Sequence, residues 1–484
     1  MATQVENRVR HSATAAQRSR SPRPVDRAAH FRRRMRASDL LVSLAVTSAA
    51  GSVALYLAYG GAGQFGSIGA VITSIGIIAG LIGTDLLLVM LLLAARIPLL
   101  DRVFGHDSVM ATHRSLGKPA IYLILGHAVL LTLGYGITAG LNPVAETVSL
   151  WSLPDMPLAF IGTGLLLAVV VTSLVAVRRR FRYEFWYAVH LLSYAAVLAA
   201  LPHQLSVGGM LAQGTPERVY WIALYVVTLG AIVTFRFVEP VVKSLQHRIT
   251  VAGVEQVAPG VASIHLSGRA LRTLGSSGGQ FFIWRFWTAK TWWHSHPISL
   301  SAVPTDTSAR ITVRALGDGS TRLGRLAPGI RVSIEGPYGL FTDAARTSPR
   351  LAIVAAGIGV TPVRALLEDS RLTPGETTIL LRSSSDGEQY LWDEIRQLAG
   401  ARGARLYTSV GPRAAGAGIA GARGAAWLSG ADVGRDVTLR SVFPNLDRSD
   451  LYVCGPQAWA DRVVADARAS GIPAHQIHVE RFDW

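Results

Sequence analysis

One apolar stretch decides how the rest of the chain is organised: YEFWYAVHLLSYAAVLAALPH, from Tyr183 to His203. It is long enough to cross a bilayer, which takes about 20 residues of helix. It carries two histidines, His190 and His203, and a second apolar stretch repeats the pattern with His113 and His127. Ionisable side chains are costly inside hydrocarbon and are rare there unless they have a function. These four histidines are therefore the first candidates for a site.

The spacing of the histidines indicates two levels within a membrane. His127 follows His113 by 14 residues, and His203 follows His190 by 13. At about 1.5 Å per residue, each pair is separated by roughly 20 Å along a helix. Zinc would need ligands that converge on one point, whereas two six-coordinate haems, each held by one imidazole from each helix, suit two levels. The pattern predicts His113 with His190, and His127 with His203, as ligands of haem iron.

The two helices differ in how well their histidines align. A step of 14 leaves His113 and His127 about 40° apart around a helix, but a step of 13 leaves His190 and His203 roughly 140° apart. Pro202 removes a helix hydrogen bond beside His203, and a kink there could turn the ring inward. A lone histidine in a membrane is more often a packing residue, and His106, in a connecting segment, is interpreted as a bystander.

Composition supports a membrane protein of several domains. The chain has 484 residues, too many for one domain, and 50% of them are hydrophobic while 16% are charged. The apolar residues are concentrated between residues 38 and 240, which we predict to be a haem-binding transmembrane domain. Six stretches there approach the length of a span: 38–59, 67–95, 112–139, 158–177, 184–204 and 219–239.

Charges on the connecting segments predict the orientation. One set of connections is rich in arginine and lysine, whereas the other set is uncharged or carries mainly Glu146 and Asp155. Because basic loops stay in the cytoplasm, we expect a multi-pass protein of the plasma membrane with both termini in the cytoplasm. A cleaved signal peptide over residues 32–51 is less favoured, because the apolar run continues to about Leu57.

The net charge of +16 arises largely near the N-terminus. Residues 1–37 form an arginine-rich segment with too little apolar content to fold, so we expect a disordered tail that contacts anionic lipid rather than nucleic acid. The chain has one cysteine, Cys454. One thiol cannot build a disulfide framework, a thiolate zinc site or an iron–sulfur cluster, so redox centres must be organic or held by histidine.

From about residue 246 the chain changes to short alternating runs separated by glycine and proline, such as VASIHLSG and ARITVRALG. This pattern predicts a small antiparallel β-barrel over residues 246–346. Within it, the turn His296-Pro297-Ile298-Ser299 could place the Ser299 hydroxyl at the edge of a flavin. Arg314, together with the small-residue loop Gly317–Thr321, could hold a pyrophosphate.

Residues 349–484 alternate between strand and helix patterns, which predicts a parallel α/β domain. Its first strand, LAIVAA, runs into Gly357-Ile-Gly-Val-Thr-Pro362 and a helix, where backbone N–H groups favour a phosphate. The turn departs from the GxGxxG pattern, because Ala355 and Ala356 precede Gly357. Arg382, at the end of the second strand, could meet a ribose 2′-phosphate, which favours NADPH while NADH stays open.

With these motifs in order, residues 38–484 resemble the ferric reductase and NADPH oxidase superfamily of transmembrane flavocytochromes b, in a bacterial form. The paired histidines match that family's haem ligands in spacing. Four short motifs match its ferredoxin-reductase-like half: HPISLS, GPYG at Gly336–Gly339, AAGIGVTP and Tyr452-Val-Cys-Gly-Pro456. The resemblance implies a six-helix transmembrane bundle, then an antiparallel β-barrel that binds FAD, then an α/β parallel-sheet domain that binds NAD(P)H.

The resemblance also implies a role for each motif. Ser299, with His296 and Pro297, would contact the flavin, and Arg314 would hold its phosphates with the loop residues Gly319, Ser320 and Thr321. The nicotinamide nucleotide's pyrophosphate would lie on Gly357, Gly359, Thr361 and Pro362. The nicotinamide site would be lined by Cys454, Gly455 and Pro456. The aromatic ending would shield the flavin through either Phe482 or Trp484.

The resulting hypothesis is an electron relay from cytoplasmic NAD(P)H through FAD and two b-type haems to an extracytoplasmic acceptor. Ferric chelates are the first expectation for the acceptor, and superoxide production from O₂ is a close second. A third alternative is an electron-supply subunit for an exported redox protein. A fourth is a membrane anchor without haem for a flavin reductase, which would leave the four histidines as coincidence.

Overall fold

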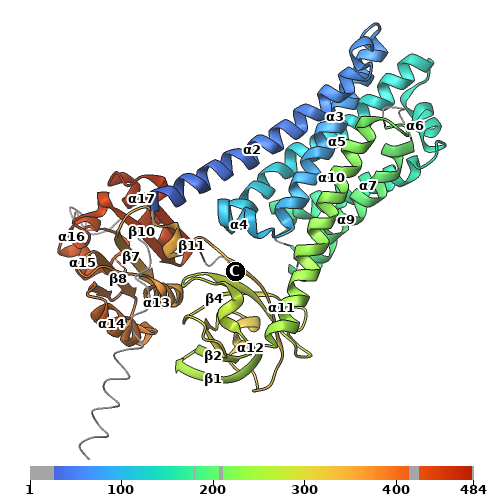
Figure 1. The fold of residues 1–484 in the computed structure, drawn as a ribbon. Coiled ribbons are helices and arrows are strands. Elements are labelled where there is room, and N and C mark those ends of the chain that lie inside the picture. Colours follow the sequence, from blue (N-terminus) through green and yellow to red (C-terminus); the bar gives the residue numbers. More distant parts are fainter. Residues whose placement is uncertain (1–26, 179, 182, 207–210, 414–424, 482–484) are drawn as a thin grey trace, which may run out of the picture.

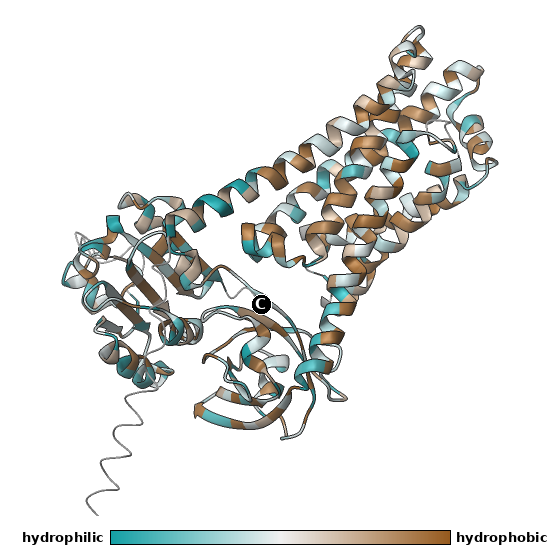
Figure 2. Ribbon diagram, viewed as in Figure 1, coloured by the Kyte–Doolittle hydropathy of each residue, from teal (hydrophilic) through white to brown (hydrophobic). Residues whose placement is uncertain are grey.

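The computed structural model describes residues 27–178, 180–181, 183–206, 211–413 and 425–481. Six helices are long and apolar enough to cross a membrane, and they lie side by side in one bundle (Figures 1 and 2). They are α2 (Arg27–Ala58), α3 (Ile68–Ala94), α5 (His106–Ala139), α7 (Met156–Ser173), α9 (Tyr183–Ser206) and a last span that begins with α10 (Pro216–Ile232). The six predicted spans are confirmed.

The last span does not end with α10. It continues through a π-helical turn, η2 (Val233–Val238), into α11 (Glu239–His247), which packs against the strand β6 (Val332–Tyr338) of the next part of the chain. Shorter helices connect the spans: α4 (Pro98–Phe104), α6 (Pro143–Trp151) and α8 (Val175–Arg178).

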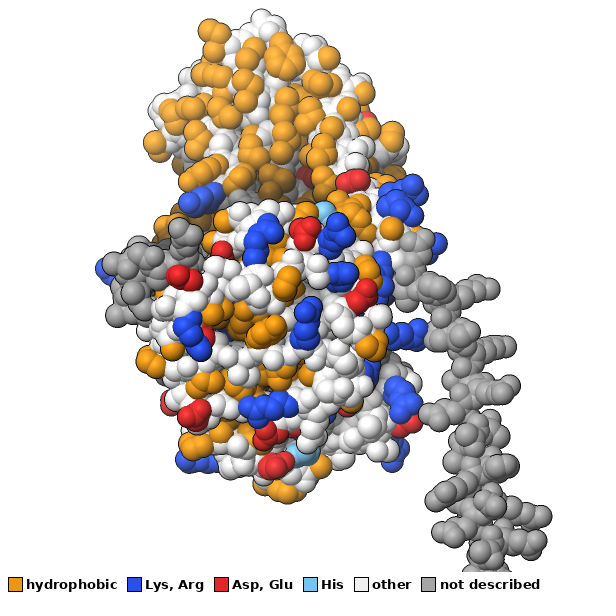
Figure 3. Space-filling model, turned by 90° about the vertical axis from the view of Figure 1, so that its left-hand side faces the viewer, with side chains coloured by type: hydrophobic (Ala, Val, Ile, Leu, Met, Phe, Trp, Pro, Cys, Tyr) orange, Lys and Arg blue, Asp and Glu red, His pale blue; other side chains and the backbone are white. Residues whose placement is uncertain are grey.

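The bundle exposes apolar side chains on its outside. Val42 is 53% exposed, Val129 57% and Val226 64%, although all three lie within spans. In Figure 3 hydrophobic side chains cover the upper part of the molecule, whereas the lower part mixes charged and apolar groups. Such a surface would promote aggregation in water, but in a bilayer it faces lipid tails.

Helices α3 and α5 pack closely because α3 presents glycines to its neighbour. Gly69, Gly76 and Gly83 are spaced by seven residues and therefore lie on one face of the helix. A Cβ atom added at Gly76 would lie 3.0 Å from the Cβ atom of Leu130. Small residues at this face let the two backbones approach, which is how helices in membranes gain contact.

Helix α2 begins earlier than predicted, so the expectation of a disordered tail up to residue 37 is wrong for residues 27–37. At about 1.5 Å per residue its 32 residues span about 48 Å, more than the ~30 Å of a bilayer core. Arginine, alanine and methionine favour helix, and the extension has a tertiary partner, because the Phe31 and His475 rings lie 5.2 Å apart. The extension thus reaches the C-terminal part of the chain (Figure 1).

The part after α11 contains two three-stranded antiparallel sheets. One has the order β1-β2-β5, from β1 (Thr250–Ala258), β2 (Val261–Ser267) and β5 (Ser308–Arg314); the other has the order β4-β3-β6, from β4 (His296–Ser299), β3 (Phe281–Phe286) and β6. Their inner faces enclose one core that includes Ile264, Trp284 and Ile311. The antiparallel prediction is confirmed, but isolated bridges such as Leu300–Ile311 join the sheets and the barrel is not closed.

The C-terminal part is a parallel five-stranded sheet of order β11-β10-β7-β8-β9, which confirms the predicted α/β fold. Helices α13 (Val360–Asp369), α14 (Trp392–Ala401) and α17 (Gln457–Ala469) pack against it. The chain order reverses between the neighbouring strands β7 and β10, and ligands of open α/β sheets bind at such a reversal. The strands are β7 (Arg350–Ala356), β8 (Thr377–Ser383), β9 (Arg405–Val410), β10 (Ser449–Gly455) and β11 (Ile477–Arg481).

Candidate redox site

Two of the four intramembrane histidines face each other near the cytoplasmic ends predicted for their helices. The ring centres of His113 on α5 and His190 on α9 lie 6.2 Å apart, with ring planes at 70°. His113 Nδ1 lies 3.0 Å from the carbonyl oxygen of Met90 on α3. Because a carbonyl only accepts, Nδ1 carries the hydrogen and Nε2 keeps its lone pair for a ligand.

The α5 histidine of the second pair is held in the same way at the other level. His127 Nδ1 lies 2.9 Å from the carbonyl oxygen of Gly76, also on α3, so the Nε2 atom of His127 is likewise free to ligate. The two α3 carbonyls are separated by 14 residues, as are the two α5 histidines. Helix α3 therefore orients both α5 rings, a role that the sequence pattern did not reveal.

His127 and His203 line one cavity of about 300 Å³ within the bundle. His203 Nδ1 is buried and has no hydrogen-bond partner among the described residues. Helix α3 comes close to His127 at Gly80, where an added Cβ atom would lie 2.4 Å from His127 Nδ1. Gly80 thus makes room for the ring. On the other helix, Pro202 lies next to His203 but does not end α9, which continues to Ser206.

These residues fit haem. A metal ion binds an imidazole nitrogen at about 2 Å, so two imidazoles on opposite sides of one ion have ring centres about 6 Å apart. The 6.2 Å between His113 and His190 matches that separation, and the mostly apolar cavity beside His127 and His203 offers room for a macrocycle. Among the residues that the structure describes, no group of three or more histidine, cysteine or acidic side chains could hold a metal ion by itself.

His190 has neighbours that the sequence reading did not single out. Trp186, one helical turn earlier, stacks on it with ring centres 5.0 Å apart and planes at 25°. Trp186 Nε1 donates to Ser173 Oγ over 3.2 Å, and that hydroxyl oxygen lies 3.5 Å from His190 Nδ1. Ser173 and Trp186 therefore restrict the rotation of this ring.

The predicted flavin turn lies on strand β4 and carries unsatisfied polar atoms. His296 Nε2 and Ser299 Oγ are buried without a hydrogen-bond partner in the described part of the chain. Buried polar atoms are almost always paired, so these two are candidates to bond a ligand. Burial lowers the pKa of His296 to about 4, with a further contribution from His294 and Arg285, so its imidazole is neutral at pH 7.

The predicted phosphate-binding residues of this half are engaged within the protein. Arg314 Nη2 lies 2.9 Å from Glu388 Oε1 of the C-terminal half. Ser320 Oγ accepts from the N–H groups of Leu316 and Gly317, and Thr321 Oγ1 donates to the Gly317 carbonyl at 2.9 Å. Gly319 lies beside the flavin turn, because an added Cβ atom there would be 3.2 Å from His296 Cε1.

The predicted nucleotide turn lies at the reversal between β7 and β10. Gly357 has a φ of +55° and faces open space, and Thr361 and Pro362 are buried in the first turn of α13. At Gly359 an added Cβ atom would lie 2.5 Å from the Cys454 carbonyl oxygen. This contact places the turn directly against the end of β10, beside Gly455 and Pro456.

Cys454 lies near the C-terminal end of β10 and is buried. Burial raises the pKa of Cys454 well above its usual value, and the nearby Glu480 carboxyl adds to the shift, so the thiol stays protonated. Glu480 lies opposite Cys454 in the β10–β11 register and was not predicted as a site residue. The predicted flavin-shielding residues Phe482 and Trp484 lie outside the described residues.

Arg382, for which contact with a ribose 2′-phosphate stays a prediction, lies buried near the end of β8. It is 3% exposed, and its terminal nitrogens donate to the carbonyl oxygens of Ser383 and, at 2.6 Å, of Gly411. Burial lowers its pKa, and the charge of Arg413 acts in the same direction. In this structure the guanidinium fastens the ends of β8 and β9 rather than pointing into solvent.

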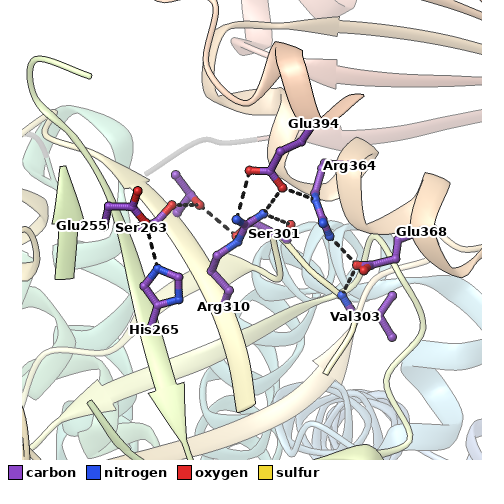
Figure 4. Close-up of polar contacts among 10 residues, drawn as sticks. Glu255, Ser263, His265, Ser301, Val303, Arg310, Arg364, Glu368 and Glu394 are labelled. Atoms are coloured by element: carbon purple, nitrogen blue, oxygen red, sulfur yellow. Dashed lines mark hydrogen bonds and ion pairs between the residues drawn. The ribbon is translucent and has the colours of Figure 1, made fainter. Parts of the chain in front are cut away.

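Ion pairs that the sequence did not reveal join the two halves of the reductase part (Figure 4). Arg310 on β5 makes two hydrogen bonds to Glu394 on α14, of 3.0 and 2.8 Å, and Arg364 Nε binds the same carboxylate at 2.8 Å. Glu368 accepts from the Val303 N–H at 2.7 Å. Burial raises the pKa of Glu394, but its bonds to the two arginines outweigh that and leave the pKa below its usual value.

The membrane bundle contacts the first of these halves through α4 and the start of α5. Asp101 accepts from the Gly339 N–H at 3.1 Å and from His106 Nδ1 at 3.1 Å. The His106 ring lies 5.0 Å from the Tyr338 ring. The placement of His106 in a connecting segment is therefore wrong, because it begins α5 and belongs to this interface. Its interpretation as a bystander to haem ligation stays a prediction.

Comparisons with known proteins agree with both parts. A family model described as "Ferric reductase like transmembrane component" matches residues 79–201. The chain is 33% identical over 173 residues to ferredoxin–NADP reductase B of Sorangium cellulosum, covering 34% of this chain and 68% of that protein. It is 31% identical over 159 residues to the ferredoxin–NAD(+) reductase component of the alkene monooxygenase system of Xanthobacter autotrophicus, covering 32% and 46%.

One solved structure matches the same part of the chain at low similarity. The FAD/NAD-binding domain of nitric oxide dioxygenase from Vibrio cholerae is 23% identical, with a TM-score of 0.38, and is covered over 99% of its length by 49% of this chain. The fold and the relatives define the class: an NAD(P)H oxidoreductase with a flavoprotein reductase part and a multi-pass membrane part. The combination of a ferric reductase-like transmembrane component with a ferredoxin–NADP reductase-like part matches the ferric reductase/NADPH oxidase superfamily.

Proposed function

We propose that this protein carries electrons from cytoplasmic NAD(P)H, through FAD and two b-type haems, to an acceptor on the other side of the membrane. The observation that carries the proposal is the double pairing of histidines. His113 and His190 lie at ligating separation, and His127 and His203 line one cavity. Two such levels divide the span into steps that electrons can cross one at a time.

The chain's own residues would hold and orient the cofactors. The Met90 and Gly76 carbonyls fix the tautomer of His113 and His127, which leaves Nε2 of each as the ligating atom. Ser299 Oγ and His296 Nε2 are free to bond a flavin, while the turn after β7 offers backbone N–H groups to a nucleotide phosphate. Bound flavin and haem would supply the redox chemistry, in which the two electrons of one hydride are passed on one at a time.

The direction of transfer rests on the charges of the connecting segments. Arg96 pairs with Glu335 of the reductase part, and Arg102 lies on α4, which contacts β6. Residues 60–66, which connect the other ends of α2 and α3, have no charge. Basic segments favour the cytoplasm, so we place both termini and the NAD(P)H site there. We propose NADPH as the donor, because the relative with the higher identity is a ferredoxin–NADP reductase. NADH is the alternative, since another relative is a ferredoxin–NAD(+) reductase component, and donor kinetics would distinguish the two.

The acceptor is proposed to be a small molecule, with ferric chelates first. The competing outcomes are reduction of O₂ to superoxide and reduction of an exported redox protein. The segments that connect the spans on the outer side are short, which favours a small acceptor over a docked protein. Rates with ferric citrate, with O₂ by superoxide detection, and with proteins that copurify would separate the three.

Replacing an outer ligand tests the relay. In His127→Ala, NADPH should still reduce the flavin at the normal rate, because the hydride site is untouched. Reduction of an external acceptor, assayed in oriented proteoliposomes, should fall at least a hundredfold. His30→Ala, an exposed histidine on α2, is the matched control. Normal external reduction by His127→Ala would show that the two-level relay is wrong.

A further inference from the structure

Helix α3 carries one charged residue, Asp85, and it is buried within the bundle. Its side chain is 2% exposed. One carboxyl oxygen, Oδ1, accepts a hydrogen bond from Ser48 on α2. Tyr220 on α10 completes the cluster, because its hydroxyl lies 2.9 Å from Ser48 Oγ and donates to the Ser48 carbonyl at 2.9 Å. Three spans therefore meet at this carboxyl.

The other carboxyl oxygen, Asp85 Oδ2, has no partner among the described residues. An ionised carboxylate in a low-dielectric interior needs several donors or a cation beside it. Here one hydroxyl donates and no lysine or arginine contact accompanies it in the described part of the chain. An environment with one donor and no cation favours a carboxyl group that binds and releases a proton over one that stays permanently charged.

Along α3, Asp85 lies between the two backbone carbonyls that orient the histidines of the two levels. It lies nine residues after Gly76 and five before Met90, whose carbonyls orient His127 and His113. At about 1.5 Å per residue these steps are roughly 13 and 8 Å along the helix. Its neighbours Thr84 and Leu88 line the cavity of His127 and His203, while Asp85 faces α2 and α10.

The ionisable groups on the packed helices are few. Tyr220 is the one that α10 brings to Asp85, while Glu217 and Arg218 lie two to three residues earlier on that helix. On α2 the nearest acid is Asp39, nine residues before Ser48. Helix α5 packs on the glycine face of α3 and presents His127 at Gly80.

We propose that Asp85 is an intramembrane proton-binding site that takes up a proton when an electron enters the bundle. This inference rests on the proposed function. NAD(P)H supplies the electron, which adds one negative charge; the proton comes from water and converts the carboxylate to a carboxylic acid, so the net charge of the dry interior is unchanged. Without such compensation each electron would be opposed by uncompensated charge in a medium that screens it poorly.

Infrared difference spectroscopy on the full-length protein in lipid nanodiscs tests the site directly. Reduction should produce a carbonyl band of a protonated carboxylic acid that moves in D₂O. The band should be absent in Asp85→Asn and present in Asp39→Asn, an exposed acid on α2. In Ser48→Ala the band should remain but shift in frequency, because the hydrogen bond to the carboxyl is lost. An identical band in wild type and Asp85→Asn would overturn the proposal.

Potentiometry on the same samples gives an independent readout. The haem midpoint potential should fall by up to about 59 mV per pH unit in wild type, the one-electron equivalent of a tenfold change, and be flatter in Asp85→Asn. Equal slopes would contradict the proposal. Haem is first quantified in each sample: its absence would refute the proposed function itself, whereas haem with an Asp85-independent slope would refute only the proton site.

Discussion

Gly80 and His127 show how a missing side chain can define a site at the scale of single residues. The ring fits beside α3 only because position 80 lacks a Cβ atom, which would lie 2.4 Å from Nδ1. Gly76 contributes its carbonyl oxygen to the same ring. Glycine normally weakens a helix relative to alanine, so these positions are explained by the close approach that they allow.

Gly80→Ala should therefore displace the His127 ring and release the outer haem. We expect haem content to fall from two to about one per protein, measured by the reduced spectrum of the purified protein. Gly126→Ala is the matched control, because it lies next to His127 on α5 yet an added Cβ atom meets nothing within 4 Å. Equal haem content in the two variants would show that Gly80 does not position the ring.

The pKa of His296 predicts a pH effect. Burial lowers it from 6.5 to about 4 in the folded protein, so the unfolded chain binds the proton more readily between these values. The contribution of His296 to the free energy of unfolding is fully present above pH 6.5 and is lost progressively as the pH falls towards 4. His296→Gln should remove this part of the acid sensitivity, followed by thermal unfolding at pH 4–7. An unchanged pH profile relative to His30→Gln would contradict the prediction.

The four histidines could be identified from the sequence because ionisable residues stand out in apolar stretches. Their orienting partners could not, because the Met90 and Gly76 groups are backbone carbonyls with no sequence signature. Arg382 shows a different limit of the sequence. Its position near a strand end could be predicted, but its hydrogen bonds to the Ser383 and Gly411 carbonyls could not, because they depend on how β8 and β9 lie together.

At the scale of elements, α3 and the α14–β5 contact organise the molecule. Helix α3 orients both rings of α5, and its opposite side meets Ser48 and Tyr220 through Asp85. In the reductase part, Glu394 on α14 binds Arg310 from β5 and Arg364 from α13. This carboxylate is thus one of several groups that join the two halves, together with Glu388 and Glu368.

Glu394→Gln should loosen this junction, because two arginines lose their shared counter-charge. We expect a cost of about 1 kcal/mol, smaller than for a fully buried pair because the Glu394 side chain is 34% exposed. Hydrogen exchange should rise around residues 301–310 and in α14. Asp393→Asn, whose side chain on the same helix is 90% exposed, is the control. Equal protection in both variants would count against the junction.

Spans and strands were predictable because hydropathy and alternation are local signals. The N-terminal extension of α2 was not, because its helix is supported by a distant contact between Phe31 and His475. That the two sheets do not close into a barrel was also beyond the sequence. It depends on which sheet edges meet, and here the two sheets join through isolated bridges such as Thr250–Arg331.

At the scale of the whole molecule, the three parts are arranged in the order in which electrons would pass. The nucleotide turn lies at the β7–β10 reversal, the flavin turn lies on β4, and α4 and α5 bring the bundle against β6 through Asp101 and His106. The inner pair, His113 and His190, belongs to the same helix α5 that His106 begins. Contact between the parts thus continues from the reductase half into the membrane.

The visible spectrum of the detergent-purified protein, before and after anaerobic NADPH with haem and flavin quantified, tests this account most directly. We expect a sharp reduced b-type spectrum with two haems per FAD, reached without any added mediator. Flavin without haem would contradict the account, because the four histidines would then be packing residues and the bundle only an anchor for a flavin reductase.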